Sequence, residues 1–354
     1  MPLVANNELP TFERLRAEGI RVLPPGRAAK QDIRELHVGL LNMMPDKALA
    51  ATERQFFRLV GESNPIAQFY VHPFTLPEIE RSSDAQAYVD RYYESFDTIR
   101  DEGLDALIVT GANVVGPELA NQPFWEPLKT VIDWASECVT STLCSCLATH
   151  AVLLFRYGQH RIHQPKKIWG VFPHQVVNKT HPLVNDVNTR FDVPHSRWNA
   201  VTREQFDAAG LRVLVESENA GVHLATSADG FRLVFSQGHP EYDTISLLKE
   251  YKREVGLYAA GQCKSYPVFP DHYLGVCEQA LLNEYRERLE SDLSAGRQPT
   301  GFPESLITAN LDNTWHDTAE AVVGNWMGTV YQVTHSDRRI PFMDGIDPGN
   351  PLGL

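Results

Sequence analysis

The sequence has few cysteines, and none of them is spaced for a zinc site. The five cysteines are an odd number and no pair forms a Cys-x-x-Cys motif; they are Cys138, Cys144, Cys146, Cys263 and Cys277. A disulfide framework or a structural zinc site usually requires paired, regularly spaced cysteines. We therefore expect reduced thiols, no disulfide scaffold and no bound metal.

Basic residues are outnumbered by acidic ones. The chain has 32 Lys and Arg residues against 45 Asp and Glu residues, which gives a formal net charge of -13. Non-specific binding to nucleic acid depends on basic surfaces that neutralise phosphates, so we expect no nucleic-acid partner. A small anionic substrate remains compatible with this charge, because a few Lys and Arg side chains can dominate a local cleft.

Long apolar runs are missing as well. No segment reaches the roughly 18 consecutive apolar residues of a membrane-spanning helix. The first eight residues have neither the basic start nor the apolar run of a signal peptide. We therefore expect no membrane association and a cytoplasmic location.

The chain does contain enough apolar sequence for a large core. Hydrophobic residues make up 43% and charged residues 22% of the 354 residues, which is ordinary for a soluble globular protein. This length fits one extended α/β domain or two smaller ones.

The first half alternates strands with helices. Apolar runs at 36–42, 66–74 and 104–110 indicate buried strands, while 46–60 and 125–136 have the apolar spacing of helices. This alternation predicts βαβ units and a parallel sheet, at whose carboxyl edge ligands usually bind.

The second half has short apolar runs separated by turn residues, followed by helices. The expected elements are strands at 211–217, 222–227 and 231–237 and helices at 243–258, 273–293 and 319–333. We expect four parts: an N-terminal extension (1–35), the main domain (36–294), a linker and C-terminal helix packed on that domain (295–338), and a mobile tail (339–354).

Cys146 is the first candidate nucleophile. It closes the strand-like run 139–145 and opens the helix-like run 147–155. A small nucleophile at a sharp strand-to-helix turn is exposed at the carboxyl end of a sheet, and the helix amides and dipole stabilise a thiolate. The alternative is a buried apolar cysteine. Cys144 points to the same face as Cys146 but lies inside the predicted sheet, where packing is its expected role.

His239 and Glu241 could serve as the base and its orienting acid. They lie in the run Gly238-His239-Pro240-Glu241 after the apolar segment 231–235. In an extended segment, residues two apart share a face, so the carboxylate could hold the tautomer of the imidazole ring. The alternative is a turn that happens to contain these residues.

Six blocks of sequence together resemble a known family. The blocks are 41–47, 108–112, 141–148, 169–172, 194–197 and 238–243. They resemble the homoserine O-acyltransferases of methionine biosynthesis, in the branch with a class I glutamine-amidotransferase-like fold. The resemblance runs from about Glu8 to Arg338. It implies an α/β, flavodoxin-like three-layer sandwich with a parallel sheet and additional C-terminal helices.

The resemblance also implies a ping-pong acyl transfer. Cys146 would attack the thioester of an acyl-CoA co-substrate, with His239 as base and Glu241 orienting it, and the acyl group would then pass to the hydroxyl of L-homoserine. No other cofactor is expected. Backbone amides at Leu147 and at the Gly111-Ala112 turn are candidates for the oxyanion hole.

The family's substrate contacts align with Lys167, Ser196 and Arg253, and Lys47 resembles a family lysine near the acyl donor. Each has a simpler interpretation. The lysines could be solvated, Ser196 could be a structural hydrogen-bonding residue, and Arg253 could pair with a neighbouring glutamate. Relatives also suggest a homodimer.

Departures from the family pattern bear on the acyl donor. The usual Thr-Gly-Ala-Pro is Thr-Gly-Ala-Asn here, and Val115, with Gly116 beside it, takes the place of a Gly in succinyl-specific relatives or a Glu in many acetyl-specific ones. Leu147 replaces a usual Trp, and Pro173 a frequent Glu. Absence of the Glu avoids repelling a succinyl carboxylate, so we expect succinyl-CoA as donor.

Several other functions stay open at this point. They are acetyl-CoA as donor, serine as acceptor, a hydrolase or glutaminase using the same triad, and a non-enzymatic sensor of acyl-CoA or an amino acid. A glutaminase would need a synthase partner domain to use ammonia, and the sequence offers none. An intact triad would be unexpected in a sensor.

Overall fold

The computed structural model describes residues 3–114, 116 and 118–354, and its centre is one mixed β-sheet. Within these residues the sheet has eleven strands in the order β2-β1-β4-β3-β5-β6-β11-β10-β9-β7-β8. The strands are β1 (Leu3–Val4), β2 (Val22–Leu23), β3 (Glu35–Leu41), β4 (Gln68–Phe74), β5 (Ala106–Val109), β6 (Ser141–Ser145), β7 (Ile162–Val176), β8 (Arg190–Ala200), β9 (Arg212–Ser217), β10 (Gly221–Thr226) and β11 (Leu233–Ser236).

The sheet is parallel in its centre and antiparallel on one side. Strands β4, β3, β5, β6 and β11 run parallel, whereas β10, β9, β7 and β8 continue the sheet in antiparallel pairs. This confirms the predicted parallel α/β core. The three late strands were expected only as hairpins; β11 does pair antiparallel with β10, and it also pairs parallel with β6.

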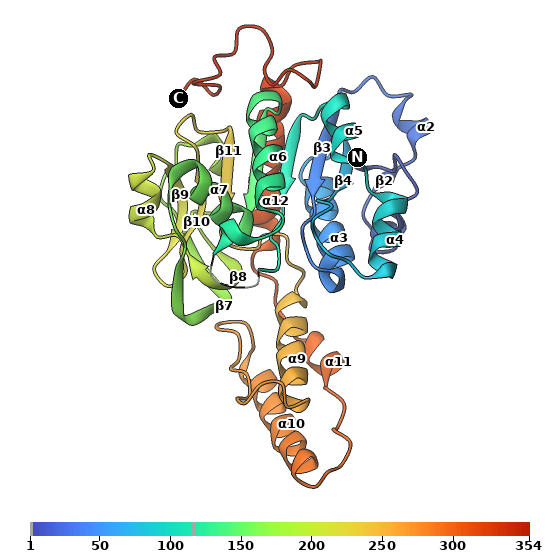
Figure 1. Ribbon diagram of the computed structural model, residues 1–354, viewed down its shortest axis with the longest axis vertical. Coiled ribbons are helices and arrows are strands. Elements are labelled where there is room, and N and C mark those ends of the chain that lie inside the picture. Colours follow the sequence, from blue (N-terminus) through green and yellow to red (C-terminus); the bar gives the residue numbers. More distant parts are fainter. Residues whose placement is uncertain (1–2, 115, 117) are drawn as a thin grey trace.

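Helices cover both faces of the sheet, as Figure 1 shows. The longer ones are α1 (Pro10–Ala17), α3 (Asp46–Glu62), α4 (Ser83–Tyr92), α6 (Trp125–Cys138), α7 (Leu147–Tyr157), α9 (Ser246–Ala259), α10 (Val276–Ser294) and α12 (His316–Val333). The short ones are α2 (Pro25–Ala28), α5 (Phe96–Glu102), η1 (Leu119–Asn121), η2 (Pro182–Val184), α8 (Arg203–Ala208) and α11 (Glu304–Thr308). None of the helices in the described part of the chain has the length and apolarity that a membrane crossing requires.

The side chains of β5 show how the three layers form. Ala106 and Ile108 pack into the cluster beneath α1, α3 and α12, while Leu107 and Val109 pack into the opposite cluster beneath α5, α6 and α7. Successive side chains of a strand point to opposite faces, so a strand covered on both sides must be apolar throughout. The all-apolar run in the sequence is therefore the mark of a central strand.

Strands β7 and β8 were not predicted from the sequence. They form a long antiparallel pair in which Trp169 lies opposite Ser196 and Ile168 opposite Arg197. Their sequences mix lysine, histidine, glutamine and proline, so they lack the regular alternation by which a half-buried strand is recognised. Burial ranges from exposed at Ile162 to buried at Trp169 within β7.

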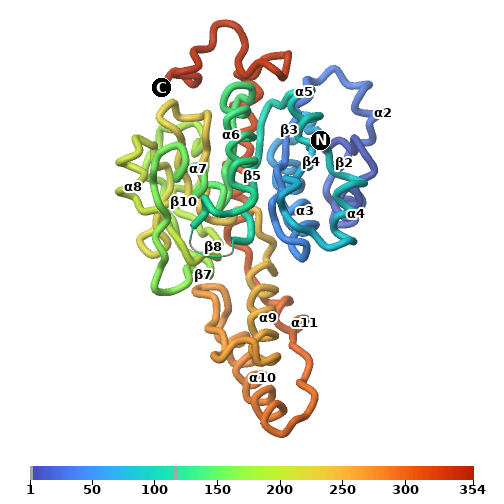
Figure 2. The backbone as a smooth tube through the Cα atoms, in the orientation of Figure 1, coloured from blue at the N-terminus to red at the C-terminus, as the bar shows by residue number. Residues whose placement is uncertain are grey.

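Helices α9, α10 and α11 form a projection that extends beyond the sheet, at the lower end of Figures 1 and 2. It has its own apolar cluster, which includes Tyr251, Leu282 and Leu289. Residue Asp271 ties the projection to the sheet, because its amide donates to Trp169 O at 2.8 Å and its carbonyl accepts from Val171 N at 2.9 Å. The predicted domain boundary at residue 294 stays a prediction.

Both terminal segments pack on the sheet domain. In the predicted N-terminal extension, β1 and β2 add two short parallel strands at the edge beyond β4. The sequence predicts a mobile tail from residue 339. Phe342, however, is buried in the core, and the guanidinium carbon of Arg232 lies over its ring, 4.8 Å from the ring centroid. The segment is therefore packed at least as far as Phe342, and mobility beyond it stays a prediction.

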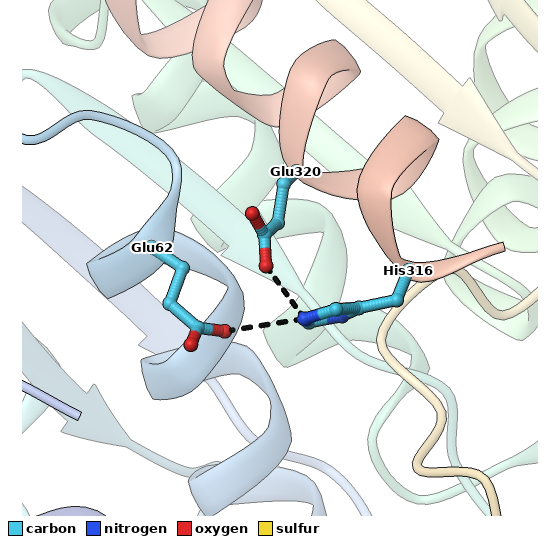
Figure 3. A group of neighbouring side chains, drawn as sticks. All are labelled: Glu62, His316 and Glu320. Atoms are coloured by element: carbon cyan, nitrogen blue, oxygen red, sulfur yellow. Dashed lines mark ion pairs between the residues drawn. The ribbon is translucent and has the colours of Figure 1, made fainter. Parts of the chain in front are cut away.

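A charged cluster joins α3 to the start of α12. The Nε2 atom of His316 lies 2.6 Å from a Glu320 carboxylate oxygen and 3.7 Å from one of Glu62 (Figure 3). The spacing of these donor atoms would also admit a metal ion, but the ion pairs by themselves account for the cluster. The hydrogen bond to Glu320 raises the pKa of His316 despite partial burial. The contribution of the His316–Glu320 ion pair to the free energy of unfolding is therefore present at acidic pH and is lost as the pH rises through the folded-state pKa of His316.

The attachment of the projection depends on Gly170. This residue has φ +146, and an added Cβ would lie 2.1 Å from the Asp271 carbonyl oxygen. We expect Gly170→Ala to lower the free energy of unfolding by about 2–5 kcal/mol, because neither backbone can move without losing the bridge. Chemical denaturation checks this.

Gly256→Ala is the matched control. Gly256 lies within α9, and an added Cβ there meets nothing within 4 Å. Alanine in an open helix interior should raise the free energy of unfolding by about 1 kcal/mol. A Gly170→Ala protein as stable as the wild type would contradict the close-contact argument.

Candidate functional site

Cys146 lies at a strained turn between β6 and α7. Its backbone has φ 51 and ψ -108, one of few positive-φ conformations at a non-glycine residue in the described chain. Its amide donates to Ser236 O at 2.7 Å, which ties the turn to the end of β11. Such a conformation at a strand-to-helix junction is typical of a nucleophile held clear of the backbone.

Gly111 borders this turn, as the predicted oxyanion hole requires. A Cβ added to Gly111 would lie 3.8 Å from the Cβ of Cys146 and 3.9 Å from the amide nitrogen of Leu147. The carboxyl end of β5 therefore lies against the first residues of α7. The Leu147 amide also stands in the first turn of that helix, where its N–H has no intrahelical acceptor.

Cys144 occupies the place that the sequence predicts. Its side chain is fully buried in the cluster beneath α6 and α7. Burial raises the pKa of the Cys144 thiol to about 12. A thiol that stays protonated in an apolar core is a poor nucleophile, so the two cysteines have distinct environments.

His239 and Glu241 form the predicted pair. The Nδ1 atom of His239 lies 2.8 Å from a Glu241 carboxylate oxygen, and both side chains are buried. Burial alone would lower the pKa of His239, but the charges of Cys146 and Glu241 and hydrogen bonds to both outweigh it and raise that pKa well above its usual value. Because Glu241 holds Nδ1, the Nε2 atom is left to face a proton donor.

The chain around His239 is fixed from several sides. An added Cβ on Gly238 would lie 2.5 Å from Val193, so only glycine allows the strand to approach β8 so closely. The His239 amide donates to Pro194 O at 2.8 Å, and the Tyr242 ring stacks on the imidazole at a centroid distance of 4.4 Å. The imidazole therefore has little freedom to turn.

Two arginines of α3 hold the segment that follows. Arg54 and Arg58 both form ion pairs with the Asp243 carboxylate, and Arg58 also donates to Glu241 O at 3.3 Å. Helix α9 begins at Ser246 and not at Asp243, where the sequence predicts it. The orienting acid is thus placed by a helix nearly two hundred residues earlier in the chain.

A cavity of about 820 Å³ opens at Cys146. The predicted site residues that line it are Ala112, Gly116, Cys146, Leu147, Lys167, Ser196 and Arg253. Lys47 is not among its lining residues and lies exposed in the first turn of α3. Val115, the predicted specificity position, lies outside the described residues.

Lys167 and Ser196 share a carboxylate that the sequence did not identify as central. The Ser196 hydroxyl donates to a Glu250 oxygen at 2.5 Å, and Lys167 Nζ lies 3.4 Å from the same atom. The other Glu250 oxygen accepts from the Tyr242 hydroxyl at 2.8 Å. The sequence suggested Glu250 or Glu254 as a possible partner of Arg253, and in the structure Arg253 pairs with Glu254 at 3.0 Å. Burial lowers the pKa of Lys167, although Glu250 opposes this effect.

Sequence reasoning missed two further arginines of the cavity, Arg161 and Arg197. Arg197 is 5% exposed and donates to the carbonyls of Ala220 and Asn199, and burial lowers its pKa to about 10. Arg161 precedes β7 and donates to Gly116 O at 3.5 Å. Arg197 stood inside one of the six sequence blocks, which was a usable signal. No local pattern pairs residue 161 with residue 116.

These features define a class of protein. It is an α/β protein with a cysteine at a strand-to-helix turn and a histidine–glutamate pair beside it, all at the carboxyl edge of a parallel sheet. The homoserine O-succinyltransferase family model matches residues 2–336. The chain belongs to the homoserine O-succinyltransferase family.

Curated relatives match over the whole chain. A protein named homoserine O-succinyltransferase from Allochromatium vinosum is 69% identical to this chain, and the alignment covers 100% of this chain and 99% of the relative. One from Thiobacillus denitrificans is 65% identical with 100% of both chains covered. One from Nitrosococcus oceani is 64% identical and covers 100% of this chain and 99% of the relative.

Two solved structures align with this chain at low sequence identity. A glutamine amidotransferase from Thermotoga maritima aligns with a TM-score of 0.44 at 10% identity, covering 84% of this chain and 98% of the other. A glutamine amidotransferase from Methylobacillus flagellatus gives a TM-score of 0.40 at 12% identity, covering 77% of this chain and 98% of the other.

The contact between His239 and Glu241 leads to a prediction about the pKa of His239. Glu241→Gln removes a negative charge that raises the His239 pKa, so we expect this pKa to fall, which histidine titration by NMR would detect. Acyl transfer should fall by about 10²- to 10⁴-fold, because the ring loses its oriented tautomer.

The exposed Glu204→Gln on α8 is the control and should change neither quantity. A His239 pKa that stays unchanged in Glu241→Gln would show that this carboxylate does not govern the imidazole.

Proposed function

We propose that this protein is a homoserine O-succinyltransferase, which transfers a succinyl group from succinyl-CoA to the hydroxyl of L-homoserine in methionine biosynthesis. Family membership and full-length relatives of that name support the reaction. The observation that carries the mechanism is the placement of Cys146 in a cavity lined by Lys167, Ser196 and Arg253. The products are O-succinylhomoserine and free CoA, and no cofactor besides the co-substrate is needed.

In the first half-reaction Cys146 is the nucleophile. Its sulfur attacks the thioester carbonyl of succinyl-CoA while Nε2 of His239 holds the thiol proton. The resulting oxyanion is stabilised by the Leu147 amide and by amides of the Gly111-Ala112 turn. The bond to the CoA sulfur then breaks, CoA leaves with the proton from His239, and a succinyl thioester remains on Cys146. One thioester replaces another, so this half-reaction is nearly balanced in free energy.

In the second half-reaction homoserine takes the place of CoA. Nε2 of His239 accepts the hydroxyl proton as the oxygen attacks the thioester carbonyl on Cys146. Collapse of the tetrahedral intermediate expels the Cys146 sulfur, which recovers the proton. Glu241 keeps the ring oriented in both half-reactions, since it bonds to the nitrogen that takes no part in proton transfer.

The acceptor is bound on the wall formed by β7, β8 and α9. Arg253 and Lys167 are suited to the carboxylate of homoserine, and Ser196 to a polar group beside it. Glu250 positions Lys167 and Ser196 through its contacts with both. Lys47, exposed at the start of α3, is assigned to the anionic part of the acyl donor by family resemblance.

The donor is succinyl-CoA because the sequence of residues 112–116, the specificity loop, contains no acidic residue that would oppose its carboxylate. Gly116 and Asn113 line the cavity on the side of this loop. Many acetyl-specific relatives carry a glutamate in the loop, where Val115 stands here. We also propose a cytoplasmic homodimer. Light scattering should give the mass of two chains, and the mass of one would refute the dimer.

The decisive test offers the purified protein four substrate pairs. Succinyl-CoA and acetyl-CoA are each combined with homoserine and with serine, and CoA release and product mass are measured. We expect the highest kcat/KM for succinyl-CoA with homoserine. Faster acetyl transfer would overturn the donor, faster transfer to serine would overturn the acceptor, and CoA release without acyl product would identify a hydrolase.

The covalent step is tested without any acceptor. With succinyl-CoA alone, we expect intact-protein mass spectrometry to find a succinyl adduct on the wild type and on Cys144→Ser. Cys146→Ser should form none, and its acyl transfer should fall by about 10⁴-fold or more. An adduct that persists in Cys146→Ser and disappears in Cys144→Ser would show that Cys144, and not Cys146, is the nucleophile.

A further inference from the structure

Arg161 stands where the specificity loop meets the cavity. It is the residue immediately before β7, it lines the same cavity as Cys146, and its Nη2 atom donates to Gly116 O at 3.5 Å. Gly116 belongs to the loop at which relatives with different acyl donors differ. A cation of the cavity therefore lies against a described residue of this loop.

The side of the cavity formed by α9 and β8 carries both cations and carboxylates. There Glu250 holds Ser196, and Glu254 lines the cavity beside Arg253. These carboxylates suit the ammonium group of an amino acid, and Lys167 and Arg253, which pair with them, suit its carboxylate. The paired charges of α9 and β8 thus form an acceptor side suited to a zwitterionic amino acid, whereas Arg161 lies beside Gly116, with Glu118 as a nearby acidic group.

The other cations of the cavity are engaged in ways that suit different roles. Arg197 is almost fully buried and donates to two backbone carbonyls, which is a structural arrangement. Arg253 is paired with Glu254, and Lys167 with Glu250, both on the acceptor side. Arg161 is half-buried, and negative charge at Glu118 and Cys146 opposes the lowering of its pKa by burial. Its guanidinium is thus electrostatically coupled to the atom that carries the acyl group.

We propose that Arg161 binds the distal carboxylate of the succinyl group, both in succinyl-CoA and in the thioester on Cys146. A guanidinium and a carboxylate match as a bidentate, charge-assisted pair, which fixes the orientation of the acyl chain as well as its affinity. The bond to Gly116 O sets the position of the guanidinium relative to the loop. This inference rests on the proposed succinyl transfer and names the residue that selects its donor.

The experiment compares two donors of similar length. Butyryl-CoA replaces the succinyl carboxylate with a methyl group, so it keeps the acyl chain and lacks the charge. Acylation of Cys146 is followed by rapid quenching and mass spectrometry, with no acceptor present, for wild type, Arg161→Gln and Arg161→Lys. Arg203→Gln is the control, because Arg203 pairs with Asp207 and Glu216 and is not among the lining residues.

We expect Arg161→Gln to slow acylation by succinyl-CoA by about 10- to 100-fold, as loss of a charge-assisted bond predicts. Acylation by butyryl-CoA should stay within about threefold of wild type, since that donor has no carboxylate to lose. Arg161→Lys should recover part of the succinyl rate, and Arg203→Gln should match wild type for both donors. This pattern also excludes misfolding, which would slow both donors alike.

Three results would count against the proposed binding of the succinyl carboxylate by Arg161. Equal losses with both donors would make it a general structural residue, and no loss with either would remove it from the donor site. No succinyl adduct on the wild type would refute both this inference and the proposed donor. A wild type that forms the adduct but does not pass it to homoserine would refute the proposed acceptor alone, and the comparison of Arg161 variants would remain valid.

Discussion

The parallel pairing of β11 with β6 is the contact on which the site depends. Ser236 lies opposite Ser145, so the two strands end side by side, one at Cys146 and the other just before His239. The Cys146 amide closes the arrangement by bonding to Ser236 O. A shift of this register by one residue would move the side chains of β11 to the other face of the sheet. The distance between the sulfur and the imidazole is therefore set by the backbone ladder.

Other parts of the molecule hold what this pairing brings together. The arginines of α3 fix Asp243, Tyr242 covers the imidazole, and Glu250 links Tyr242 to Lys167 and Ser196. Each partner comes from a different element, so the site is rigid although much of it lies on loops. Such preorganisation lowers the cost of orienting the groups during acyl transfer.

Local sequence signals predicted the central layer, the turn at Cys146 and the contact between His239 and Glu241, and the catalytic roles of these residues stay a prediction. The apolar runs of β3 and β5, the amphipathic α3 and the turn at Cys146 each depend on residues close together in the chain. The pairing of β11 with β6 and the roles of Glu250 and Arg161 do not. They follow from contacts between residues separated by tens of positions, for which a single sequence carries no periodic or motif signal. Strands β7 and β8 were missed because their polar composition suits the wall of a cavity, not a core.

The helical projection contributes to the site, because its first helix places Arg253 and Glu254 in the wall of the cavity and Glu250 against Lys167 and Ser196. The sulfur and the oxyanion donors instead come from the central strands. In the proposed reaction the acceptor would thus contact the projection as well as β7 and β8, whereas the acyl group would be held at the central strands. Selection of the amino-acid acceptor can diversify through changes in the projection, while the scaffold that forms the acyl-enzyme stays intact.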